Sequence, residues 1–348
     1  MTSPARSASD VTQGRSDAET QGKRSLRHCV SASLRLGWAG SPYLSLIVVT
    51  MIWGSLHPIG KLAMRDITPI QLVLARVVFA AIVLTVLLAA RGQAGEILHE
   101  LRTRPTTMAV LGACSFFGSS GPAMIALSLL PASVSSLLAN TSPLFVALGI
   151  IALSRGRTRG DAVLGILVGF CGLAVVVFGE SPASFGQLAL NPLGVGLSLV
   201  GSVTWALYIG LGRQAMAKGN GLAVVVASAC FGGLPWLVVA AVNGDLGRYL
   251  LLAPADWALL LFLGAVGTGL TYGLWTAALA RLSAASVAVF QYAIPFWAVV
   301  LSVALLSERV TVPLVVGGAM IVGGIALTQR ATRRATRRVQ TAAASSRA

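Results

Sequence analysis

Charged residues are scarce in this chain of 348 residues: they make up 11% of it, while hydrophobic residues make up 55%. A soluble domain carries about 25% charged residues. The mean hydropathy of +0.81 departs from a soluble domain in the same direction. This deficit excludes an ordinary soluble protein and predicts an all-α, polytopic membrane protein.

Motifs that carry out chemistry are missing as well. The sequence has no Walker loop, no metal-ligand spacing and no Ser/His/Asp set. Its four cysteines lack CxxC spacing, and they are Cys29, Cys114, Cys171 and Cys230. No Asp or Glu lies well inside an apolar run, so proton antiport through an intramembrane carboxylate is poorly supported. We therefore expect no enzyme activity, no cofactor and no metal.

The beginning of the chain lacks the hydrophobic core of a signal peptide. We expect residues 1–41 to be a disordered cytoplasmic tail and residues 330–348 a basic cytoplasmic tail. The net charge of +15 does not indicate nucleic-acid binding, because the arginines gather in tails and short loops. With both termini cytoplasmic, the basic residues left for the outer loops are Lys61, Arg65, Arg248 and Arg309.

Long apolar runs, by contrast, are abundant. We place ten spans, each near the ~20 residues that cross a bilayer, at 42–62, 69–90, 107–129, 132–154, 161–179, 192–212, 220–242, 256–279, 284–307 and 311–328. Two of them carry Pro143 and Pro295 near their middle. Because proline removes a backbone donor, we predict a hinge in each helix at mid-membrane depth, a pattern typical of transporters.

The second half of the sequence repeats the first at an offset of 152 residues. Trp53 then pairs with Trp205, and Pro143 with Pro295. Each half holds five spans, an odd number, so the second half is expected to be inserted upside down. We divide the chain into a first five-helix repeat at 42–190 and a second, inverted repeat at 191–329.

With these features the chain resembles the ten-helix transporters of the drug/metabolite transporter superfamily, specifically the EamA family, over about residues 42–328. The residues that carry the resemblance are Trp53-Gly54, Pro69, Arg76, Pro143, Pro295 and Ser307-Glu308-Arg309. The family usually has Gly where Ser307 stands, and the first half has no acid at the matching place. The resemblance implies transport of a small solute; relatives move amino acids, other metabolites, nucleotide sugars and drugs.

Three residues of the first two spans are candidates for substrate binding. Arg76 lies inside the hydrocarbon region, where a lipid-facing arginine costs ~2.5–3.5 kcal/mol. It therefore faces a cavity and holds an anionic group, or it hydrogen-bonds a carbonyl at a broken helix. The alternatives are a structural clamp and a side chain that snorkels outward. His57 and Trp53 share one helix face. His57 binds substrate or is a buried histidine satisfied by a carbonyl, and Trp53 lines a cavity or simply packs.

Polar residues also lie within one turn of the two prolines: Asn140, Gln291 and Tyr292. They contact substrate, or they form hydrogen bonds between helices. Weaker candidates of the same kind are Tyr208, Tyr272 and Trp275. Glu308, at a helix end, is expected to be a cap or a loop anchor.

Together these features predict a secondary transporter, an exporter of a small metabolite such as an amino acid or organic acid, working by alternating access. The excess of arginine over lysine suggests a GC-rich bacterial genome, and hence the inner membrane of a bacterial cell. A lipid scramblase or a membrane-embedded enzyme is the alternative. The expected partners are the substrate and membrane lipids, not nucleic acid, and a homodimer is left open.

Overall fold

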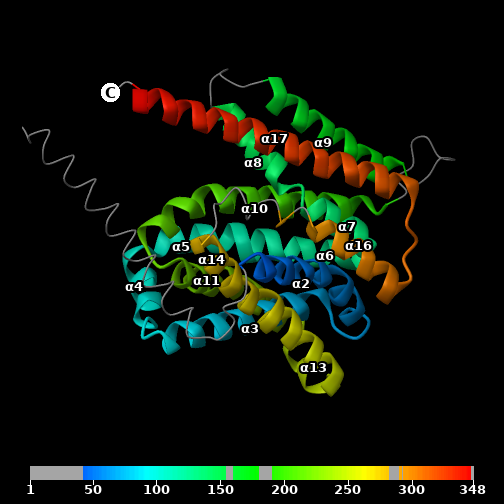
Figure 1. Cartoon of the computed structure of the whole chain (residues 1–348). Coiled ribbons are helices and arrows are strands. Elements are labelled where there is room, and N and C mark those ends of the chain that lie inside the picture. Colours follow the sequence, from blue (N-terminus) through cyan, green and yellow to red (C-terminus); the bar gives the residue numbers. More distant parts are fainter. Residues whose placement is uncertain (1–41, 154–159, 180–189, 282–289, 292, 346–348) are drawn as a thin grey trace, which may run out of the picture.

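The computed structural model describes residues 42–153, 160–179, 190–281, 290–291 and 293–345, and every regular element in these ranges is a helix. In chain order the elements are α2 (Pro42–Ala63), α3 (Pro69–Ala90), α4 (Gly95–Thr103), α5 (Pro105–Gly112), η1 (Ala113–Ser120), α6 (Gly121–Leu129), α7 (Ala132–Ala139), α8 (Ser142–Leu153), α9 (Gly160–Phe178), α10 (Pro192–Lys218), α11 (Gly221–Val242), α12 (Asp245–Arg248), η2 (Tyr249–Leu251), α13 (Pro254–Leu261), η3 (Phe262–Leu270), α14 (Thr271–Arg281), α16 (Ala293–Leu306) and α17 (Val312–Ser345). Figure 1 shows their arrangement.

The described residues contain eight helical stretches long and apolar enough to cross a membrane. Two shorter apolar helices, Val163–Phe178 and Ala293–Leu306, fall where the sequence predicts the fifth and ninth spans. The polytopic, all-α class is confirmed. Length and hydropathy support eight spans where the sequence predicts ten.

Proline and small polar residues set where the helices begin. Thr68 caps α3: its Oγ1 accepts from Gln71 N at 3.2 Å, and Gln71 Oε1 accepts in turn from Thr68 N at 2.9 Å. Pro69 then occupies the first helical position, where its missing N–H costs nothing. Asn191 and Asn220 cap α10 and α11 in a similar way.

The third span of each half contains a π-helical segment, η1 in one and η3 in the other. Such segments are often found at functional sites. Trp236 of α11 stabilises η1, because its Nε1 donates to the Phe116 carbonyl oxygen at 3.1 Å. In η3, Thr268 Oγ1 donates to the Leu263 carbonyl oxygen at 3.1 Å. Neither segment is predicted from the sequence.

The fourth predicted span is broken where its proline predicts. The helix ends at Ala139 and resumes at Ser142, so Pro143 is the second residue of α8. Pro295 is the third residue of α16, in the first turn, where proline is tolerated. Both prolines thus lie near the beginning of a helix rather than within an unbroken one.

Each half packs mainly on the other. Contacts join α3 to η3 and α11 to α5 and η1; they also join α2 to α16 and α10 to α7 and α8. The largest buried cluster lies among α2, α3, α6, α11 and η3. The helices therefore enclose the region between the two halves.

Helices α9 and α17 form a separate pair along one side of the molecule (Figure 1). They touch through glycines, since a Cβ on Gly172 would lie 2.6 Å from the Gly317 carbonyl oxygen and one on Gly165 would lie 2.7 Å from that of Gly324. The later glycine of α9, Gly172, contacts the earlier glycine of α17, Gly317, so the two helices are antiparallel. Helix α17 continues past the predicted end of its span, as far as Ser345.

Candidate functional site

A cavity of about 480 Å³ lies between the two halves. Its size is within the ~300–1,000 Å³ typical of small-molecule sites. The predicted site residues that line it are Trp53, His57, Arg76, Asn140, Gln291, Pro143 and Pro295. Tyr292 lies outside the described residues. The structure therefore brings seven predicted residues to one cavity, and their binding of substrate remains a prediction.

Arg76 projects from α3 and is half-buried. Its Nη1 donates to Met124 Sδ at 3.4 Å, and its Nη2 donates to Thr268 Oγ1 at 3.5 Å. Both bonds are weak, because a thioether is a poor acceptor and 3.5 Å is long. The buried Nε has no partner. Arg76 thus retains most of its capacity to bind an anionic group.

No carboxylate neutralises Arg76 within the part of the chain that the structure describes. The side-chain ion pairs found there join Arg104 to Glu100 and Arg248 to Asp245. A buried charge without a counter-charge is costly. Arg76 is thus without an ionic partner among the described residues, and its binding of an anion stays a prediction.

Trp53 lines the same cavity as Arg76. Its Nε1 donates to Thr271 Oγ1 at 2.9 Å, and its ring centroid lies 4.9 Å from that of Trp275. Tyr272 completes this aromatic cluster at 6.3 Å. His57, one turn further along α2, has a buried Nδ1 without a partner. The predicted backbone-carbonyl partner is thus not found at that atom.

The alternative interpretation predicts that Asn140 forms a hydrogen bond between helices, but among the described residues its side chain bonds only within its own helix. Its Nδ2 donates to the Ser136 carbonyl oxygen at 2.8 Å and so closes the end of its own helix, α7. The Gln291 carbonyl oxygen accepts from Ile294 N at 3.1 Å. Both side chains still line the cavity at the beginnings of the proline-bearing helices.

Several lining residues were not predicted. Thr268 and Met124 contact Arg76, while Ser198 and Gln329 contribute buried oxygens, Oγ and Oε1, that have no partner. Serine and threonine are common in such helices, so the sequence holds no signal for them. Gln329 could have been found as the last polar residue before the arginine-rich tail.

Two charged side chains hold the turn between α6 and α7, at one end of the cavity-forming helices. Lys61 Nζ donates to the carbonyl oxygens of Leu127, Ser128 and Leu130 at 2.7, 3.0 and 2.9 Å. The Lys61 amine therefore caps the C-terminal end of α6.

Glu308 holds the same turn from its other side. Its carboxylate accepts from Ala132 N at 2.6 Å and from Ser133 N and Oγ at 3.1 and 2.6 Å. This confirms the expectation of a cap, placed on the N-terminus of α7. Ser307 has φ 55°, the left-handed region that favours glycine. The left-handed backbone at Ser307 explains why the family usually has glycine at this position.

The connection between α11 and α13 lies near the beginning of α3. Tyr249 Oη donates to the Gln71 carbonyl oxygen at 2.6 Å, and Thr68 Oγ1 donates to Asp245 Oδ1 at 3.2 Å. Burial, followed by the nearby Asp245 carboxylate, raises the pKa of the Tyr249 hydroxyl. The hydroxyl therefore stays protonated and keeps donating at neutral pH.

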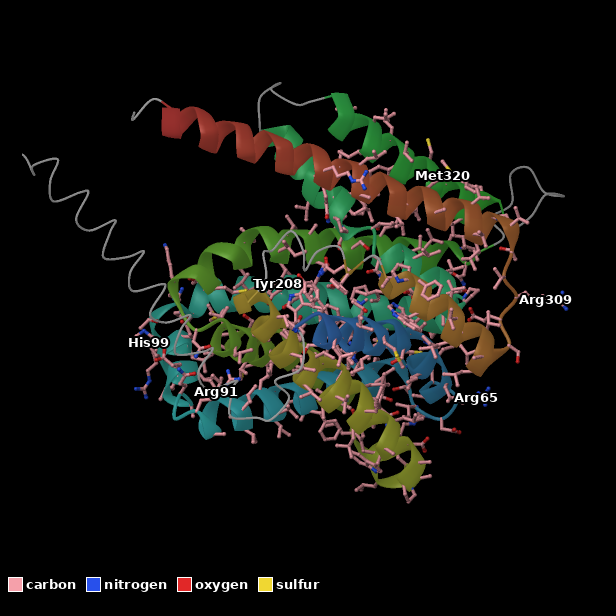
Figure 2. All side chains as sticks on the ribbon, in the orientation of Figure 1. Arg65, Arg91, His99, Tyr208, Arg309 and Met320 are labelled. Carbon is pink, nitrogen blue, oxygen red and sulfur yellow. The ribbon has the colours of Figure 1, made fainter. Side chains whose placement is uncertain are left out.

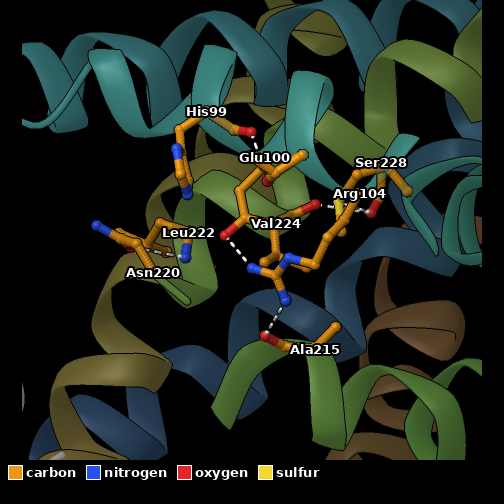
Figure 3. Close-up of polar contacts among 10 residues, drawn as sticks. His99, Glu100, Arg104, Ala215, Asn220, Leu222, Val224 and Ser228 are labelled. Carbon is orange, nitrogen blue, oxygen red and sulfur yellow. Dashed lines mark hydrogen bonds and ion pairs between the residues drawn. The ribbon is translucent and has the colours of Figure 1, made fainter. Parts of the chain in front are cut away.

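The opposite end of the molecule is held by a buried ion pair (Figure 3). Glu100 of α4 pairs with Arg104, whose Nη1 also donates to the Ala215 carbonyl oxygen of α10 at 3.3 Å. Glu100 is 1% exposed. The described residues contain no group of three His, Cys, Asp or Glu side chains that could hold a metal ion.

Helical spans around a cavity shared by two halves define a multi-pass membrane transporter. The chain belongs to the EamA-like transporter family, whose model matches it twice, at residues 40–178 and 192–330. This confirms the family that the sequence motifs indicate.

Relatives point to the same class. An "Uncharacterized transporter" of Archaeoglobus fulgidus is 24% identical over 82% of this chain and 96% of its own length. "Uncharacterized protein PA1977" of Pseudomonas aeruginosa is 31% identical over 66% and 77%, and "Uncharacterized transporter YetK" of Bacillus subtilis is 24% identical over 82% and 86%. A crystal structure 22% identical shares the fold, with a TM-score of 0.56 over 83% of this chain and 98% of that one.

Proposed function

We propose that the chain is a secondary transporter that exports a small organic metabolite bearing a carboxylate or a similar acid. The observation that carries this proposal is Arg76, a guanidinium in the cavity wall with weak partners and no facing carboxylate in the described residues. Arginine can hold a carboxylate or phosphate through two parallel N–H bonds. An anionic group would offset the cost of burying the charge.

Alternating access would come from ten helices in two inverted halves. Antiparallel packing of α9 and α17 supports this arrangement, because they are the last helices of the two family matches. Helices α3 and α11 also exchange equivalent contacts, each packing on the π-helical segment of the other half. Pro143 and Pro295 would be the hinges.

We place both termini in the cytoplasm, with Arg65 and Arg309 at the outer end and Arg91 and His99 at the inner end (Figure 2). The cavity wall then extends inward to Met216, Gly221 and Gln329. The turn held by Lys61 and Glu308 closes the outer end. This is the conformation in which a cytoplasmic substrate enters.

Export also agrees with the charge of the site. A membrane potential that is negative inside drives an anion outward when no other ion moves with it. The free energy gained is about 2.3 kcal/mol per charge for every 100 mV. A lipid scramblase would need a polar groove facing lipid, whereas large exposed side chains of the described spans include Val86, Leu164 and Phe296. Transport is therefore favoured over scrambling.

A thermal-shift screen of the purified protein would test the substrate class, because a ligand of the native state raises its midpoint. We expect organic acids to raise it, Arg76→Lys to reduce the shift, and Arg76→Gln to abolish it. A quaternary ammonium compound that stabilises all three proteins equally would overturn the proposal.

Cysteine labelling would test the orientation. In a Cys-free background, Leu250→Cys should react with an impermeant thiol reagent outside intact cells, and Ala94→Cys should not. Both positions are exposed in the structure, so the reverse pattern would contradict the orientation.

A further inference from the structure

The aromatic residues of this chain are not distributed evenly around the cavity. Among the residues that the structure describes, three tryptophans and two tyrosines line it, compared with one phenylalanine. Phenylalanines such as Phe178 and Phe296 are instead exposed on the outer faces of their helices. Filling space alone would not separate the two groups in this way.

The aromatic side chains form two groups, one shared by α2 and α14 and one on α10. Trp53 of α2 packs with Tyr272 and Trp275 of α14 at ring-centroid distances of 6.3 and 4.9 Å. Trp205 and Tyr208 of α10 form the second group, at 5.0 Å. Figure 2 shows Tyr208 in the interior of the molecule. The cavity is thus walled by rings on α2, α10 and α14.

Aromatic walls suit two kinds of ligand: a flat ring, through offset or edge-to-face contacts, and a cation, through the ring faces. Arg76 decides between them, because its positive charge lines the same cavity. A cation would meet like charge in a site with low dielectric, where repulsion is poorly screened. A ring that carries an acid satisfies both features.

We infer that the cavity takes a flat aromatic carboxylate of one or two rings, its acid on Arg76 and its ring against Trp53 and Trp275. This inference rests on the proposed function and specifies the substrate class. The indole of Trp53 is held in place by its hydrogen bond to Thr271 Oγ1, so the wall is preorganised. The unpartnered oxygens of Ser198 and Gln329 offer hydrogen bonds to polar substituents on the ring.

Titration calorimetry of the purified protein with four matched probes tests this inference. Indole-3-acetate carries both features, cyclohexylacetate lacks the flat ring, indole-3-acetamide lacks the charge, and tryptamine reverses it. We expect indole-3-acetate to bind tightest. Trp53→Leu and Trp275→Leu should each weaken it roughly two- to tenfold, while Trp53→Phe should lose less.

Trp257→Leu is the matched control, because Trp257 lies on α13 against Phe79 and Tyr249 and does not line the cavity. It should leave binding unchanged, and the ligand-free thermal midpoint of each variant shows whether it folds. Cyclohexylacetate binding as tightly as indole-3-acetate, with both dependent on Arg76, would overturn the aromatic preference and leave the proposed function standing. Preferential binding of tryptamine would overturn both.

Discussion

Positions 76 and 228 lie 152 residues apart, in corresponding helices of the two halves, and they share a backbone setting. Beside Arg76, a Cβ on Gly264 would lie 2.7 Å from Phe79 Cβ and 3.2 Å from Arg76 Cα. Beside Ser228, a Cβ on Gly112 would collide with the Ser228 carbonyl oxygen and lie 3.2 Å from Phe231 Cβ. The same glycine contact thus supports both helices.

The side chains at these two positions differ completely. Ser228 is fully buried, and its Oγ donates to the Val224 carbonyl oxygen of its own helix at 2.6 Å. Arg76 lines the cavity with its Nε unpartnered. The comparison shows that the repeat preserves backbone packing, while the arginine of this pair comes from the first half alone.

The largest effect should come from removing that one-sided charge. Arg76→Gln should weaken binding of an organic acid about ten- to a hundredfold, since a hydrogen bond to a charged group contributes ~1.5–3 kcal/mol. Ser228→Ala should leave affinity unchanged. Calorimetry with the acid that stabilises the protein most would measure both, and equal losses would show that the two positions share a role.

Filling the two glycine contacts should sharpen the comparison. Gly112→Ala and Gly264→Ala should each destabilise the protein by about 1–3 kcal/mol, as overpacking does. Only Gly264→Ala should also weaken acid binding, because it displaces the backbone of Arg76. Thermal midpoints and calorimetry separate the two effects; weaker acid binding in Gly112→Ala would contradict the assignment.

The turn held by Lys61 and Glu308 is a second feature in which the two halves differ. The residue 152 positions before Glu308 is Gly156, so the first half has no acidic residue at the matching position. Lys61→Met and Glu308→Gln should loosen the outer end of the cavity. In a protein that also carries Ser198→Cys, an impermeant thiol reagent added outside should then label position 198 several times faster. Arg309→Gln, on an exposed neighbour, is the control. Unchanged labelling in both clamp variants would show that the turn does not close the cavity.

The smallest effect concerns the backbone next to Glu308. Ser307→Gly should raise the thermal midpoint slightly, because glycine adopts the left-handed conformation without the strain energy of roughly 1–2 kcal/mol that other residues have there. Ser307→Ala keeps the strain and should not raise it. Acid affinity should stay the same in both variants, since Ser307 does not line the cavity. A lower midpoint for Ser307→Gly would contradict the strain.

Much of the site was accessible from residue types and spacing. Arg76 could be found because an arginine in the hydrocarbon region is costly wherever the fold places it. The break before Pro143 followed from a missing backbone donor. Thr268, Ser198 and the turn held by Lys61 could not be found, since their importance depends on which helix lies opposite.

The sequence by itself determined the membrane class, the repeated halves and several helix ends, because hydropathy, proline and capping residues act within a few neighbouring residues. Tertiary structure alone decided that Trp53 meets Thr271 and that Glu308 caps α7. Those contacts depend on the register between packed helices. Glycines such as Gly172 and Gly317 set that register through how closely two backbones approach, which no local pattern encodes.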